Sequence, residues 1–164
     1  MSTAPTPYAP GGPADEATRL LLRHLVATIA FRTRVCLAGA PLGFGAYTPG
    51  DGVRTPTELV VHLVGLCRFA QGLLTGLPRQ EEGDLGWREA VGRLEAALRA
   101  LDAAIAEAPM WHHAPTAALQ GPLADALTHV GQLAMLRRLA SAPVAADNYA
   151  RAPIEVGDLA LGER

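Results

Sequence analysis

Apolar residues recur at intervals of three and four along four stretches of this chain of 164 residues. Residues three or four apart lie on one face of an α-helix, so each stretch predicts an amphipathic helix with one buried stripe. The predicted helices cover residues 15–39, 55–75, 85–108 and 121–142. Because such helices bury their stripes against one another, the pattern predicts an all-α fold, a four-helix bundle.

The second predicted helix carries the clearest start signal. Thr55 can cap it, Pro56 fits the first helical position, and Glu58 stands at the capping-box spacing from Thr55.

In the fourth predicted helix, Arg137 and Arg138 lie near the carboxyl end. We expect their positive charges to interact favourably with the negative end of the helix dipole and to have no further role.

Composition supports helices and argues against several classes of partner. The chain is 49% apolar but only 5% aromatic, which favours closely packed helices over a sheet. Its formal net charge is -2 with no long run of either sign, so we expect no nucleic-acid partner. Charged and polar residues interrupt the longest apolar stretches, so we also expect no membrane partner.

The two ends of the chain differ in pattern from its middle. Residues 1–13 are rich in Pro, Gly, Ser and Thr, and we predict a disordered arm there. They lack the basic and apolar regions of a signal peptide, which predicts a cytoplasmic protein. Residues 14–164 are predicted to form a single domain, in which the segment from residue 144 onward is an extended tail.

The two cysteines, Cys36 and Cys67, each lie inside an apolar helical pattern. A thiol in such a position usually packs as a small buried hydrophobic group. We therefore expect neither a disulfide nor a reactive thiol.

Three residues that can bind a metal lie on apolar faces of two predicted helices. Asp125 and His129 are four residues apart, so they lie on the same stripe, which Gln132 continues. His62 lies among leucines in the second helix. Burying an unpaired carboxylate costs several kcal/mol, so Asp125 needs a cation, a donor or water beside it.

Two imidazoles and one carboxylate can hold one divalent ion and leave its other positions open to water or substrate. His62, Asp125 and His129 would form that set. The alternative is a hydrogen-bonded network without metal, because a single histidine in a helix is usually a core residue. Gln132 is expected to hydrogen-bond within the bundle or to orient a ligand, and His24 to lie at the helix boundary or in a pocket.

The segments TPTELVVHLVGL and DALTHVGQLAMLRRLAS together resemble the DinB/YfiT-like superfamily of metal-dependent four-helix bundles. Members typically carry one His in the second helix and a His-x-x-x-His pair in a later helix, with Gly-Gln soon after the second His. His62 matches the first position, and His129, followed by Gly131 and Gln132, matches the last. Asp125 stands where the family usually has His. The resemblance covers most of residues 15–142.

This resemblance implies a divalent metal ion, nickel, zinc, manganese or iron, and a homodimer. It also implies a small-molecule substrate and, as in some relatives, a low-molecular-weight thiol for transfer or isomerisation. The leading hypothesis is therefore a metal-dependent transferase, isomerase or hydrolase. The alternatives are a non-catalytic ligand-binding or dimerising bundle with a residual polar triad, and a regulatory protein that acts through its dimer surface.

Overall fold

The computed structural model describes residues 8–78 and 83–162, and within these residues it has helices and no strand. This confirms the predicted all-α class. The elements in chain order are α1 (Glu16–Leu37), the 3₁₀ turn η1 (Phe44–Ala46), α2 (Pro56–Thr75), α3 (Trp87–Glu107), α4 (Pro115–Ala118), the π-helical turn η2 (Leu119–Leu123) and α5 (Ala124–Leu139).

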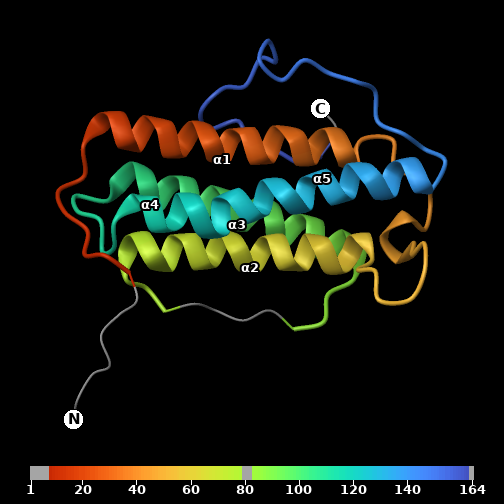
Figure 1. Ribbon diagram of the computed structural model, residues 1–164, viewed down its shortest axis with the longest axis horizontal. Helices are drawn as coiled ribbons and strands as arrows, with labels where there is room; N and C mark the ends of the chain where they lie inside the picture. Colours follow the sequence, from red (N-terminus) through yellow and green to blue (C-terminus); the bar gives the residue numbers. More distant parts are fainter. Residues whose placement is uncertain (1–7, 79–82, 163–164) are drawn as a thin grey trace.

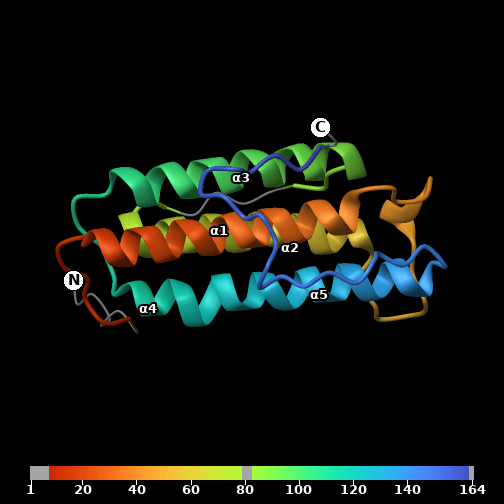
Figure 2. The ribbon, with the colours of Figure 1, turned by 90° about the horizontal axis from the view of Figure 1, so that it is seen from above.

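The long helices lie side by side in a bundle (Figures 1 and 2). α1 and α5 run in one direction, and α2 and α3 run in the opposite direction. α1 packs on α3 and α5, and α2 packs on the same two helices, so α1 and α2 lie on opposite corners. The contact between α2 and α5 brings the two helices with metal-capable residues together.

The local signals of α2 behave as predicted. The Thr55 hydroxyl accepts a hydrogen bond from the backbone N–H of Glu58, and the Glu58 carboxylate accepts one from the Thr55 N–H at 2.7 Å. This capping box satisfies two backbone donors that a helix start leaves free. The helix ends at Gly76, whose φ of 77° lies in the left-handed region that favours glycine.

Aliphatic side chains from every long helix form the core. Leu and Ile residues that are fully buried occupy the inner stripes, as the three- and four-residue spacing predicts. The largest of these side chains are Ile29, Leu59, Leu63, Leu74, Leu94, Leu98, Leu101, Ile105, Leu123 and Leu133.

The last helical segment begins earlier than the sequence predicts. Its first turn starts at Pro115, not at Gly121, and it continues through η2 into α5. Gly121 has φ -92° and ψ -105°, outside the helical region, and Pro122 lies within the same turn. Glycine and proline there kink the helix and do not start it, because the flanking residues already have helical partners.

The predicted disordered arm is wrong for residues 9–13. These residues run beside 109–114, and the two segments exchange backbone hydrogen bonds. A Cβ atom on Gly11 would lie 1.9 Å from the Trp111 carbonyl oxygen, so glycine there permits a close backbone contact. Residues 1–7 of the predicted arm lie outside the described residues.

The tail is extended, as predicted, and crosses α1 toward α3 (Figure 2). Arg34 on α1 donates to the Asp158 carboxylate at 3.1 Å, and the Leu161 N–H donates to Glu95 on α3 at 2.8 Å. Leu159 and Leu161 are buried against the bundle. These contacts attach the tail to two helices.

Two arginines bind the carbonyl ends of neighbouring helices. Arg137 is 4% exposed, and its guanidinium donates to the carbonyls of Cys36, Ala38 and Gly39 at the end of α1. Arg19 does the same for the last carbonyls of α3. The expectation that Arg137 serves only its own helix dipole is therefore wrong: its charge satisfies acceptors that the end of α1 leaves unpaired.

Replacing Arg137 by Met should lower the free energy of unfolding by about 3 kcal/mol, because buried carbonyls lose charge-assisted donors. The matched change Arg138→Met, at the exposed neighbour, should cost less than about 0.5 kcal/mol. Urea unfolding followed by circular dichroism measures both. Equal losses in the two variants would contradict the role assigned to Arg137.

By length and composition alone, α2 is apolar enough to cross a membrane, with a mean hydropathy of 1.2 over its best window. Buried core helices meet the same criterion, and one face of α2 packs against α3 and α5.

Candidate metal centre

His62, Asp125 and His129 meet at the contact between α2 and α5. His62 lies in the second turn of α2, Asp125 in the first turn of α5, and His129 one turn later. Asp125 Oδ2 is 3.5 Å from His62 Nε2, and Asp125 Oδ1 is 3.4 Å from His129 Nε2. One donor atom from each residue lies within 4.8 Å of the others, so the three residues could hold a metal ion.

The kink in η2 lies directly before α5. Gly121 has a backbone conformation outside the helical region, and regular α-helix resumes at Ala124. Asp125 and His129 both follow the kink, so the kink sets the direction of the helix that carries both side chains.

Gln132 fixes the orientation of the His129 ring. His129 Nδ1 lies 2.8 Å from Gln132 Oε1, so the Nδ1–H donates to the amide oxygen. In that tautomer, Nε2 carries a lone pair and faces Asp125. A metal-binding histidine usually donates a hydrogen bond from one ring nitrogen, which leaves the lone pair of the other nitrogen available to the ion. Of the two roles predicted for Gln132, the hydrogen bond within the bundle is present.

The two imidazoles differ in burial and stand at right angles. Their ring centroids are 4.5 Å apart with an interplanar angle of 90°. His129 is buried, whereas the side chain of His62 is 33% exposed and that of Asp125 is 46% exposed. The centre is therefore closed on one side and open to solvent on the other.

Burial lowers the pKa of His62 below its usual value. Electrostatic interaction with His129 and Arg54 lowers it further, and the carboxylate of Asp125 opposes the shift. A lowered pKa favours the neutral imidazole, which is the form that binds a metal.

The spacing of the donors is compatible with a shared ion. Two ligands about 2.1 Å from a tetrahedral zinc ion lie about 3.4 Å apart. The distances from the Asp125 carboxylate to the two imidazoles, 3.5 Å and 3.4 Å, are close to that value. A hydrogen bond between His62 and Asp125 fits the same geometry.

His24 does not belong to this cluster. It is exposed on α1, on the same stripe as Leu21, which is 72% exposed. The inner stripe of α1 instead contains Leu22, Val26 and Ile29. His24 lines neither of the two cavities described below.

A cleft that the sequence does not predict lies beside the candidate metal centre. It has a volume of about 450 Å³ and lies between one stripe of α5, from His129 to Leu139, and the loop 49–54 that precedes α2. Arg54 lines it, and its charge acts on His62. The one sequence signal for its position is that Arg54 directly precedes the capping residue Thr55.

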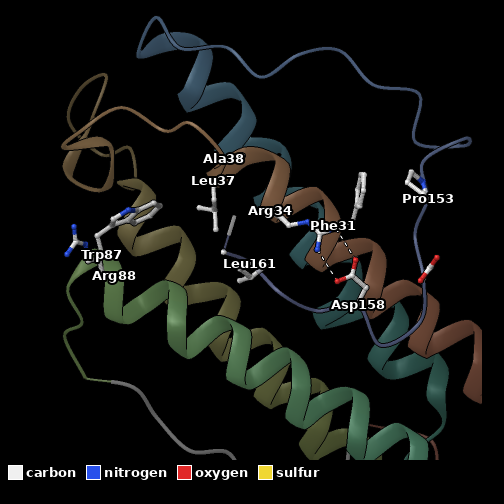
Figure 3. A pocket seen from close by; sticks show the side chains of 11 residues that line it. Phe31, Arg34, Leu37, Ala38, Trp87, Arg88, Pro153, Asp158 and Leu161 are labelled. Carbon is white, nitrogen blue, oxygen red and sulfur yellow. Dashed lines mark hydrogen bonds and ion pairs between the residues drawn. The ribbon is translucent and has the colours of Figure 1, made fainter. Parts of the chain in front are cut away.

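A larger cavity, of about 1200 Å³, lies away from the metal centre, between α1, the start of α3 and the tail (Figure 3). Arg34 and Asp158 pair with each other across it, and Trp87 and Arg88 lie at its far side. The metal-capable cluster does not line this cavity, so we place the candidate site at the smaller cleft.

Both cysteines are buried and free, as predicted. Burial raises the pKa of Cys67 to about 12 and that of Cys36 to about 11, although Arg137 and Arg32 partly oppose the second shift. Neither thiol is part of the metal-capable cluster.

The native protein should therefore react only slowly with a thiol reagent such as DTNB at about pH 8, because the reactive thiolate is scarce and covered. Both thiols should react rapidly after unfolding in guanidinium chloride. Stopped-flow absorbance measures the two rates. Rapid labelling of either cysteine in the native protein would contradict this account.

Comparisons of the chain with family models, with curated proteins and with solved structures find no match.

Proposed function

We propose that this chain is a metal-dependent enzyme of the DinB type, whose divalent ion is bound by His62, Asp125 and His129. The observation that carries the proposal is the meeting of two imidazoles and one carboxylate, from two helices, at distances that suit a common ion. The resemblance of the two helix segments to DinB/YfiT-like proteins supports the same assignment.

The donor set favours a transition metal. Imidazole nitrogens suit zinc, iron and nickel, and a carboxylate oxygen also suits manganese, whereas magnesium and calcium prefer oxygen ligands. One carboxylate and two neutral imidazoles carry a charge of about −1, so a divalent ion leaves the centre with about +1. We expect zinc, nickel, iron or manganese, in agreement with the resemblance.

The residues of the chain have separate tasks in this proposal. Asp125 supplies charge, His62 and His129 supply neutral nitrogens, and Gln132 keeps Nε2 of His129 free. A divalent ion supplies Lewis acidity, which lowers the pKa of a thiol or water bound to it. The solvent-exposed side of the centre and the adjacent cleft give a small substrate access.

Metal binding tests the assignment directly. Chelator-stripped wild type, prepared without a His tag, should take up one zinc ion per chain when measured by mass spectrometry. His129→Ala and His62→Ala should bind at least about a hundredfold more weakly, and Gln132→Leu about tenfold to a hundredfold more weakly. His24→Ala is the matched control and should bind like wild type.

A wild type that stays empty with zinc, nickel, manganese and iron would overturn the proposal. Zinc uptake at wild-type affinity by both His129→Ala and His62→Ala, together with loss of zinc binding in His24→Ala, would also overturn it.

The second candidate is a non-catalytic bundle in which the three side chains form a polar network. Asp125 favours it, because a carboxylate that is 46% exposed can be solvated without a cation. In that case a double change, His62→Leu with Asp125→Leu, should stabilise the fold.

Thermal melts separate the two candidates. If the centre holds zinc, an excess of a hundred times Kd should raise the stability of wild type by about 2.7 kcal/mol, and a chelator should reverse the change. The double leucine variant should not respond to zinc. A wild-type melting temperature that zinc does not move, together with a more stable double variant, would favour the non-catalytic network.

A further inference from the structure

The cleft beside the metal centre has one continuous wall. His129, Gln132, Leu136 and Leu139 follow one another at three- and four-residue intervals on α5, so they form a single stripe. His129 and Leu139 are ten positions apart, which corresponds to about 15 Å along the helix. The cleft, here called the α5 cleft, therefore extends from the metal centre toward the end of the bundle where α5 ends (Figure 1).

Exposed apolar side chains line both sides of the α5 cleft. Met135 and Leu139 on α5 are 56% and 52% exposed, and Val53 on the opposite loop is 46% exposed. Leu59 and Leu136, which are buried, also line the cleft. Exposed apolar side chains that line one concavity indicate a binding surface more strongly than the same residues scattered singly.

A cation also lines the α5 cleft. Arg54, on the loop before α2, is exposed, and its charge acts on both His62 and Glu58. Glu58 uses its carboxylate oxygen in the capping box with Thr55. Among the described residues the Arg54 side chain forms no hydrogen bond or ion pair, so its guanidinium can donate to an anion.

We propose that the α5 cleft binds an amphipathic carboxylate, with its carboxylate beside Arg54 and the metal centre and its apolar part over Met135, Leu136 and Leu139. The proposal deepens the proposed function by naming its substrate class. The proposal rests on the proposed function only for the metal ion beside the carboxylate. Arg54 and the apolar wall are part of the chain whether or not an ion binds.

Charge and size favour this ligand over a cationic ligand and over a second protein chain. Arg54 and a metal centre with a charge of about +1 would repel a cationic head group. A volume of about 450 Å³ falls within the range of small-molecule sites. A second protein chain usually buries about 800 Å² per partner, which is far more than three partly exposed side chains supply.

The probe is decanoate below its micelle concentration, measured by isothermal titration calorimetry on the zinc-loaded and the zinc-free full chain. Decanoate should bind at least about tenfold more tightly than 1-decanol, because the alcohol lacks the charge. Octanoate should bind about tenfold more weakly than decanoate, because it buries two fewer methylene groups. Decyltrimethylammonium should not bind.

Two variants test which residues bind the carboxylate and which bind the apolar chain of the ligand. Arg54→Met should weaken decanoate about tenfold and leave 1-decanol unchanged, whereas Leu139→Ser should weaken both. Both changes are at exposed positions, so folding should persist. Met110→Ser is the matched control, since Met110 is 62% exposed outside the cleft.

Equal affinity for decanoate and 1-decanol, or no effect of Arg54→Met, would overturn the proposal. A dimer in sedimentation velocity that Leu139→Ser dissociates, without decanoate binding in either protein, would instead assign the surface to a second copy. Zinc binding without decanoate binding would refute this proposal alone. Arg54-dependent decanoate binding in a protein that takes up no zinc would support the cleft and refute the metal centre.

Discussion

The packing of α2 against α5 is the contact on which the candidate site depends. It places a histidine of one helix against an acid and a histidine of the other, so neither helix alone could form the cluster. Two local features shape that contact. The capping box fixes where α2 begins, and the kink at Gly121 sets the direction of α5.

The ends of the helices show a second constraint, which is the need to satisfy backbone carbonyls. At the ends of α1 and α3, an arginine from a neighbouring helix binds the last carbonyls. Arg137 belongs to α5, the helix that carries Asp125 and His129. The same helix therefore holds the end of α1 and supplies the candidate metal ligands.

The sequence predicts the regular parts of this molecule well and the contacts between distant segments poorly. Helical period and the capping residues around Thr55 depend on neighbours three or four residues away, so α1, α2 and α3 lie close to where they were predicted. Residues 9–13, the start at Pro115 and the role of Arg137 depend on partners far along the chain. For the site, spacing and resemblance predicted His62, Asp125, His129 and Gln132, but the contribution of Arg54 required the fold of the loop before α2.

X-ray absorption at the zinc edge of the loaded protein tests the central claim most directly. The account predicts two imidazole nitrogens and one carboxylate oxygen at about 2.0–2.2 Å, with water completing the shell. A sulfur ligand at about 2.3 Å, or a shell of oxygen atoms without imidazole scattering, would contradict it.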